Sequence, residues 1–91
     1  MNIKLITTIE YNQTFSRAYK KLSLKEKILA EKREKIFRQN AFDPKLKTHK
    51  LKGKLKDYWL FSITYSHRIL FKFTIKGKVL FYDIGDHDIY Q

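Results

Sequence analysis

The chain has 91 residues, which is enough for one domain with one modest hydrophobic core. A hydrophobic content of 43% excludes a disordered chain, and the absence of cysteine excludes disulfide bonds and thiolate sites. The formal net charge is +11, from 20 Lys and Arg against 9 Asp and Glu. This charge favours binding to a polyanion, with nucleic acid as the first candidate, although a basic surface for an acidic protein partner has the same composition.

The N-terminal part of the chain predicts one strand and one amphipathic helix. Residues 3–9 are rich in Ile, Leu and Thr and predict a strand that must pair with a sheet formed later in the chain. The apolar run is too short for a signal sequence or a spanning helix, so we expect a cytoplasmic protein without a membrane segment. Asn12 or Thr14 is expected to cap the helix. Its apolar stripe consists of Phe15, Ala18, Tyr19 and Leu22.

A second helix is predicted from Ser23 to about Asn40. Ser23 and Glu26 have the spacing of a capping box, and Asp43-Pro44 ends the helical pattern. The helix exposes many lysines and arginines. A basic connector follows over residues 45–56, with six lysines and no acid. Repeated positive charge in an extended segment predicts contact with phosphates, and a solvated loop is the alternative. The candidate RNA-binding lysines of this segment are Lys50, Lys52, Lys54 and Lys56.

The C-terminal third of the chain predicts three consecutive antiparallel strands. Apolar residues alternate over residues 59–64 and 69–75, Lys76-Gly77 has the composition of a tight turn, and residues 79–84 return as an apolar strand. The expected fold class is therefore α+β, in the order β-α-α-β-β-β over residues 1–91, with both helices on one face of a small antiparallel sheet. The residues expected to be buried are Phe15, Tyr19, Leu29, Ile36, Phe71, Phe73 and Ile84.

Several groups with chemical potential lie in or beside these strands. Arg68 opens the central strand on the face opposite Phe71, where it could meet a phosphate or pair with an aspartate. His87 follows the last strand, after Gly85, which we expect to let the backbone turn. Imidazole exchanges protons near neutral pH. Tyr90 is a candidate for stacking on a base.

Metal binding is the other possibility at the C-terminal end. Asp86, His87 and Asp88 supply hard ligands, but no established ligand spacing is present. We therefore expect no metal and no cofactor.

Three strings in this order resemble a known family. They are HKLKGKLKDYW (residues 49–59), HRILFKF (residues 67–73) and DIGDHDIY (residues 83–90). Together they resemble the RelE/ParE superfamily of small bacterial toxins, and most closely its RelE, YafQ and YoeB branch of ribosome-dependent messenger-RNA endonucleases. The resemblance covers nearly the whole chain and implies a RelE-like fold.

The resemblance also implies roles for individual residues. Arg68 matches an arginine that contacts the scissile phosphate, His87 and His49 match histidines of the active site, and Tyr90 resembles a terminal aromatic at the bound codon. His67 lies beside this arginine and is a further candidate for RNA binding. Asp86 and Asp88 flank His87 and favour its protonated form, which suits an acid. The base is then His49 or no protein group at all.

The function implied by the resemblance is that of a toxin of a type II toxin–antitoxin system that cleaves messenger RNA in the ribosomal A site. Its partners would be a cognate antitoxin, the ribosome and messenger RNA. Two other readings stay open: a ParE-like inhibitor of DNA gyrase without nuclease activity, and a non-catalytic basic module that binds RNA or an acidic protein.

Overall fold

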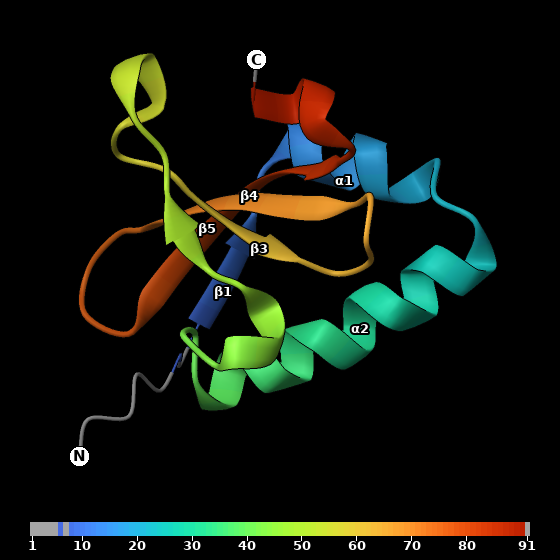
Figure 1. Ribbon diagram of the computed structural model, residues 1–91, viewed down its shortest axis with the longest axis horizontal. Coiled ribbons are helices and arrows are strands. Elements are labelled where there is room, and N and C mark those ends of the chain that lie inside the picture. Colours follow the sequence, from blue (N-terminus) through green and yellow to red (C-terminus); the bar gives the residue numbers. More distant parts are fainter. Residues whose placement is uncertain (1–5, 7, 91) are drawn as a thin grey trace.

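The computed structural model describes residue 6 and residues 8–90 of the chain (Figure 1). A short strand and two helices precede a connector and three further strands. The elements are β1 (Thr8–Tyr11), α1 (Gln13–Lys20), α2 (Leu24–Gln39), β2 (His49–Lys50), β3 (Trp59–Ser62), β4 (Arg68–Phe73) and β5 (Lys78–Gly85). Three 3-10 helices complete the chain: η1 (Pro44–Leu46), η2 (Gly53–Leu55) and η3 (His87–Tyr90).

The strands form one five-stranded sheet in the order β1-β5-β4-β3-β2. The predicted α+β class is confirmed, with two corrections. The sheet is mixed, because β1 pairs with β5 in parallel, and the connector adds the two-residue strand β2 at the edge of β3. The predicted first strand covered residues 3–9, of which 3–5 and 7 lie outside the described residues. Its pairing with the C-terminal strands is confirmed, and it extends to Tyr11.

Local capping signals determine where both helices begin. The side chain of Asn12 accepts a hydrogen bond from the backbone N–H of Phe15 at 2.8 Å. At α2, the Ser23 hydroxyl accepts from the backbone N–H of Glu26, and the Glu26 carboxylate accepts from the backbone N–H of Ser23. The predicted capping box is confirmed, since both halves of the reciprocal pair are present.

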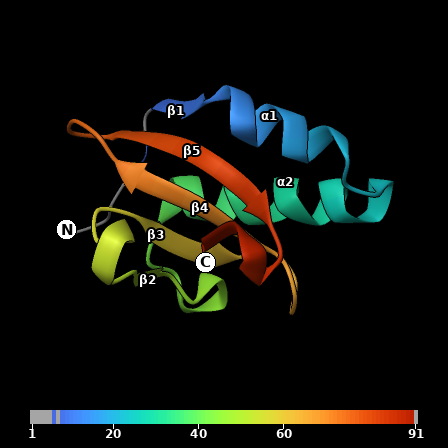
Figure 2. The same cartoon turned by 90° about the horizontal axis from the view of Figure 1, so that it is seen from above.

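A cluster of phenylalanine rings joins the helices to the sheet. Phe37 of α2 is fully buried and lies 4.6 Å from Phe61, 4.9 Å from Phe71 and 5.5 Å from Phe81, measured between ring centroids. Phe15 of α1 lies 5.4 Å from the same Phe81. Since both helices contact one side chain of β5, they cover the same face of the sheet, as predicted. Figure 2 shows α2 behind the strands and η3, next to the C-terminus, in front of them.

Not all of the expected core residues are fully enclosed. Phe15, Phe71 and Ile84 are buried as predicted. The prediction is wrong for four residues that are only partly buried, because they lie at the rim of the core; Tyr19, for example, directs its hydroxyl outward to Glu31, 3.4 Å away. The four are Tyr19, Leu29, Ile36 and Phe73. Among residues 6 and 8–90, no helix combines the length and apolar character needed to cross a membrane.

Replacing Phe37 tests the central position of this ring cluster. Phe37→Ala removes a fully buried ring that contacts three strands, so we expect a loss of about 3–5 kcal/mol in the free energy of unfolding, measured by urea denaturation. Leu24→Ala on the same helix is the control, because Leu24 is 74% exposed and should change stability little. Equal losses for the two variants would contradict the assignment of Phe37 to the core.

Candidate active site

Arg68 and His49 lie on the same face of the sheet, the one that neither α1 nor α2 covers. Across the strands, Ser62 pairs with Arg68 and Arg68 with Gly85. In the neighbouring row, His49 pairs with Leu60 and Leu60 with Leu70. Residues that face each other across paired strands project from the same face, as do residues two apart in one strand. His49 and Arg68 therefore share the face opposite the buried phenylalanines.

Arg68 is half-buried and has no carboxylate partner within ion-pair distance among the described residues. The alternative expectation, an ion pair between Arg68 and an aspartate, is therefore wrong for the described residues. Its neighbours across the strands are the small, uncharged Ser62 and Gly85. An arginine with free guanidinium N–H groups and small neighbours is suited to receive two oxygens of a phosphate.

His49 lies on the edge strand β2 and is exposed. Its Nδ1 atom lies 3.0 Å from the carbonyl oxygen of Lys47. Because a carbonyl only accepts, Nδ1 must carry the proton that is donated in this bond. The neutral ring then presents an unprotonated Nε2, which is the atom that a general base requires.

His87 is placed by the close packing of η3 on the end of β5. A Cβ atom at Gly85 would lie 2.8 Å from Cγ2 of Ile89, which is closer than real Cβ contacts allow. The backbone at Gly85 is not left-handed, so glycine is required here for space rather than for the turn that the sequence suggested. This close approach returns η3, with His87 and Tyr90, toward β4 and β5.

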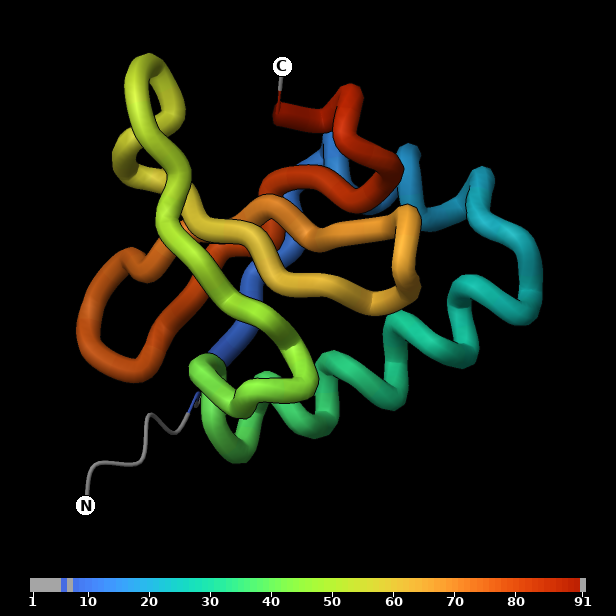
Figure 3. The backbone as a smooth tube through the Cα atoms, viewed as in Figure 1, coloured from blue at the N-terminus to red at the C-terminus, as the bar shows by residue number. Residues whose placement is uncertain are grey.

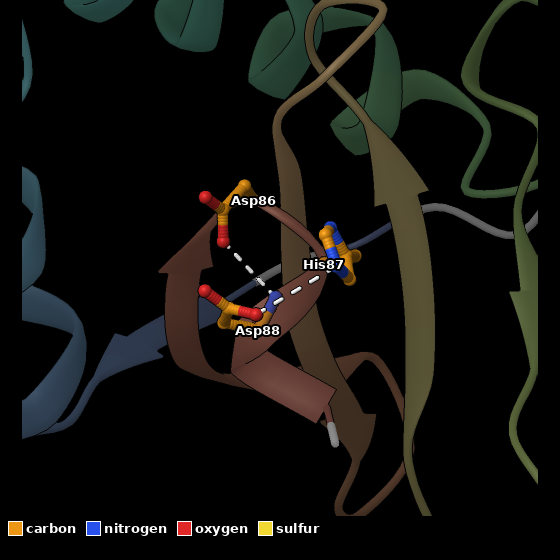
Figure 4. A group of neighbouring side chains, drawn as sticks. All are labelled: Asp86, His87 and Asp88. Atoms are coloured by element: carbon orange, nitrogen blue, oxygen red, sulfur yellow. Dashed lines mark hydrogen bonds and ion pairs between the residues drawn. The ribbon is translucent and has the colours of Figure 1, made fainter.

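The His87 ring is exposed and directed away from Asp86 (Figure 4). Its Nε2 atom lies 3.7 Å from Oδ1 of Asp88, while the Asp86 carboxylate accepts a hydrogen bond from the backbone N–H of Asp88 at 3.0 Å. Only a protonated ring makes an ion pair with Asp88. Tyr90, at the end of η3, is half-buried.

The same three residues are the group in the described part of the chain that could hold a metal ion. One ligand atom from each of Asp86, His87 and Asp88 lies within 4.8 Å of the others, and all three residues are exposed. Exposed acidic groups are common without an ion, and no fourth His, Cys, Asp or Glu among residues 6 and 8–90 joins this group.

Asp83 precedes this group and lies opposite Leu70 of β4. Its partial burial raises the pKa of the carboxyl group, although the backbone N–H of Ile84 donates a hydrogen bond to it at 2.8 Å, which acts in the opposite direction. Burial therefore disfavours the charged form of this carboxyl group.

His67 is not brought together with Arg68, its neighbour in the chain. Its Nε2 atom lies 3.4 Å from the Glu26 carboxylate at the beginning of α2. The backbone hydrogen bond from Ser23 lowers the pKa of Glu26, and the positive charge of His67 acts in the same direction. His67 thus connects the β3–β4 turn to α2, and Figure 3 shows this turn beside the first half of that helix.

The connector lysines are exposed, and they surround a short protruding loop. Lys50, Lys52, Lys54 and Lys56 are all exposed, while Leu51 and Leu55 between them are partly buried. Figure 3 shows the η2 loop and the C-terminal η3 rising on the same side of the sheet, away from α2. The lysines therefore border the face that carries Arg68.

The sequence analysis missed one polar residue in the row of paired residues that contains Arg68 and Gly85. Ser62 ends β3 directly opposite Arg68, and it is half-buried. The signal was present, since alternation along β3 places Ser62 on the opposite face from Phe61. What was lacking was the pairing register between β3 and β4, which residue alternation within one strand does not determine.

Substitution of Gly85 tests the placement of η3. Gly85→Ala puts a methyl group against Ile89, so we expect η3 to detach while the sheet stays folded, with a stability loss of about 1–3 kcal/mol. Amide hydrogen exchange at residues 87–90 should accelerate more than exchange in β4. The double variant Gly85→Ala/Ile89→Ala removes the conflicting Cγ2 atom and should restore slow exchange. Unchanged exchange in Gly85→Ala would show that η3 does not depend on this contact.

Comparison with known proteins identifies the fold. No protein-family model matches the sequence, and no curated protein sequence matches it. Solved structures do match. A YoeB/ParE toxin from Agrobacterium tumefaciens superimposes with a TM-score of 0.77 at 16% identity, over 89% of this chain and 99% of that one. YafQ in the E. coli DinJ–YafQ toxin–antitoxin complex gives a TM-score of 0.73 at 22% identity, over 97% and 98%.

A copper-bound mutant toxin from Helicobacter pylori also matches, with a TM-score of 0.73 at 20% identity over 92% of this chain and 98% of that one. At these identities the comparisons establish the architecture. The resemblance that the sequence indicated is thereby confirmed at the level of the fold: the chain has the α+β fold of the YafQ and YoeB/ParE toxins.

Proposed function

We propose that the chain is the toxin of a type II toxin–antitoxin pair and acts as a ribosome-dependent endoribonuclease on messenger RNA. The observation that carries the proposal is the unpaired Arg68 on the helix-free face of the sheet, between the strand of His49 and the segment that carries His87. A cation for the phosphate and two groups that exchange protons are what metal-independent RNA cleavage needs.

The proposed roles follow from the position of each group in this arrangement. Three strand spacings separate β2 from β5, which is about 14 Å, with Arg68 on a strand between them. An RNA strand bound across the strands would place one phosphate at Arg68. It would have His49 on one side and His87 on the other.

In the reaction, Nε2 of His49 removes the proton from the ribose 2′-hydroxyl, and the 2′-oxygen attacks the adjacent phosphorus. The bond from phosphorus to the 5′-oxygen breaks, and protonated His87 donates a proton to that leaving oxygen. The products are a 2′,3′-cyclic phosphate and a 5′-hydroxyl. Arg68 stabilises the charge that accumulates on the phosphate oxygens. DNA lacks the 2′-hydroxyl, so this chemistry is specific for RNA.

Tyr90 and the connector lysines contribute to binding in this proposal. Tyr90 lies in the same short helix as His87 and would stack on a base beside the scissile phosphate. Lys50, Lys52, Lys54 and Lys56 border the face and would contact phosphates of messenger or ribosomal RNA. His67 contacts Glu26 of α2 and stabilises the β3–β4 turn, so any contact that it makes with RNA would be at this turn.

An antitoxin and the ribosome are the partners that this function implies. One neighbour of the same fold is a toxin in complex with its antitoxin, which supports a protein partner for this chain as well. A net charge of +11 supports docking on ribosomal RNA. The second candidate function is inhibition of DNA gyrase without nuclease activity, which the sequence also left open.

Loss of the acid is the first test of this proposal. His87→Ala should reduce messenger-RNA cleavage on ribosomes by about a hundred- to ten-thousand-fold, because general acid catalysis contributes about that much. His87 is 62% exposed, so folding should be unaffected. Cleavage is measured by primer extension on a defined message, and ribosome binding by co-sedimentation. Arg68→Ala should also be severely impaired, and Lys76→Ala, in the exposed β4–β5 turn, is the control that should cut normally.

Expression in bacteria separates the two candidate functions. Under the nuclease proposal, wild-type protein arrests growth and His87→Ala does not. Equal growth arrest by the two proteins, with no RNA cut by either, would contradict the nuclease and support the action on gyrase.

A further inference from the structure

A basic pocket of about 310 Å³ lies beside Arg68, at the uncovered edge of β3. Four cationic side chains line it: Arg33 of α2, Lys45 of η1, the following Lys47, and Arg68. Its lining contains no carboxylate. The sequence predicted phosphate contact for the connector that contains Lys45 and Lys47, but not that these lysines meet Arg33 and Arg68, because the segments are distant along the chain.

The fold opens this pocket because β2 is so short. β2 pairs only His49 and Lys50 with β3, so the edge of β3 at Ser62 has no strand beside it. Lys47 precedes β2 in a left-handed conformation, with φ of 54°, which turns the chain away from a continued pairing. A non-glycine residue held in this region is uncommon and marks a geometry that the surrounding structure imposes.

Hydrogen bonds organise the walls of the pocket before any ligand arrives. Arg33 donates from Nη1 to the carbonyl oxygen of Lys45 at 2.7 Å, which joins α2 to η1. On the opposite wall, the hydroxyl oxygen of Thr64 accepts from the backbone N–H groups of Ser66 at 3.2 Å and His67 at 2.9 Å. Both walls are therefore fixed by contacts within the protein, and binding does not have to order them.

The charge in the pocket favours one class of ligand. Like charges gathered in a partly enclosed space repel each other, and an anion removes that repulsion. Arginine and lysine together with the hydroxyl of Ser62 are the donors that phosphate oxygens accept. A volume of about 310 Å³ is at the lower end of the range of about 300–1,000 Å³ for ligand pockets, which suits a single nucleotide unit.

Tyr65 points to a nucleotide rather than to free phosphate. It lines the same pocket, and its ring is 99% exposed at the tip of the β3–β4 turn. A large aromatic ring left in solvent beside a phosphate pocket offers a face on which a base stacks. The β3–β4 turn that carries it is tied to α2 through His67 and Glu26, so the backbone at Tyr65 is held beside the pocket.

We propose that this pocket binds the nucleotide next to the scissile phosphate of single-stranded RNA. Arg33, Lys45 and Lys47 hold its phosphate, and Tyr65 stacks on its base. Arg68 belongs both to this pocket and to the row with His49 and His87, so the two phosphates are neighbours along one RNA strand. The assignment of the scissile phosphate to Arg68 rests on the proposed function, while nucleotide binding in the pocket does not.

The test uses a fluorescein-labelled 2′-O-methyl RNA hexamer, which cannot be cleaved, and fluorescence anisotropy across a salt series. For single strands, each phosphate contact contributes about 0.7 to the slope of log K against log salt. Lys45→Ala/Lys47→Ala should therefore weaken binding and reduce the slope by about 0.7–1.4. The matched control Lys25→Ala/Lys76→Ala removes two exposed lysines outside the pocket and should leave the slope unchanged. Equal slope changes in both pairs would overturn the proposal, because the binding would then follow net charge alone.

Tyr65 provides an independent readout that does not involve charge. Tyr65→Ala should weaken binding of the hexamer by about 5- to 150-fold, the range for loss of one stacked base. Tyr65→Phe keeps the ring and should bind as the wild type does. Equal affinities of Tyr65→Ala and the wild-type protein for the hexamer would contradict nucleotide binding in the pocket.

The two proposals fail in different ways. His87→Ala should bind the hexamer normally, because His87 does not line the pocket. If the wild-type protein cuts no RNA on ribosomes but the pocket variants lose hexamer binding, the proposed nuclease activity is wrong and nucleotide binding in the pocket is supported. If cleavage is normal in Lys45→Ala/Lys47→Ala and in Tyr65→Ala, with hexamer binding unchanged, the proposed nucleotide binding in the pocket is wrong and the nuclease activity is supported.

Discussion

The packing of Phe37 against the phenylalanines of three strands is the interaction on which the rest of the molecule depends. Phe61, Phe71 and Phe81 come from β3, β4 and β5, and all three lie within 5.5 Å of Phe37 between ring centroids. Because side chains alternate between the two faces of a strand, burying these rings commits their neighbours to the other face. The aromatic core therefore decides which residues of the sheet remain available for chemistry.

The position of Arg68 is a consequence of this commitment. A shift of β4 by one residue would bury a guanidinium and expose Phe71, and both changes are strongly unfavourable. The irregularity between Leu70 and Phe71 lets the β4–β5 ladder keep the phenylalanines in the core while Arg68 stays opposite Gly85. The same glycine allows η3 to pack against the sheet, so the arginine and the histidine segment are placed by one short stretch of β5.

The parts of the fold that sequence predicts well are those encoded by near neighbours. The Ser23–Glu26 capping box, the Asn12 cap and the turn at Gly77, where φ is 76°, each depend on a few adjacent residues. The candidate site was predictable in part for the same reason, since Arg68 and His87 each lie in a short local string. The sequence predicted phosphate contact for the connector lysines, but it did not predict that Lys45 and Lys47 form one pocket with Tyr65 and Arg68, because these residues meet only in three dimensions. Likewise, the half-burial of Tyr19 and Phe73 depends on how much of each ring the neighbouring elements cover, which hydrophobic periodicity does not report.

The parallel pairing of β1 with β5 also has a consequence for the order in which the molecule is completed. Thr8 faces Lys78, so partners in one ladder are 70 positions apart (78 − 8 = 70). At about 5–20 residues per second of synthesis, β1 waits roughly 4–14 s for the strand that it pairs with. Contacts so distant along the chain form late, after local helices and hairpins. The segment with His87 follows β5 and packs against β4 and β5, so it takes its position only after β5 has been synthesised. The helices and the strand that begins with Arg68 are therefore synthesised before the segment that carries His87 and Tyr90.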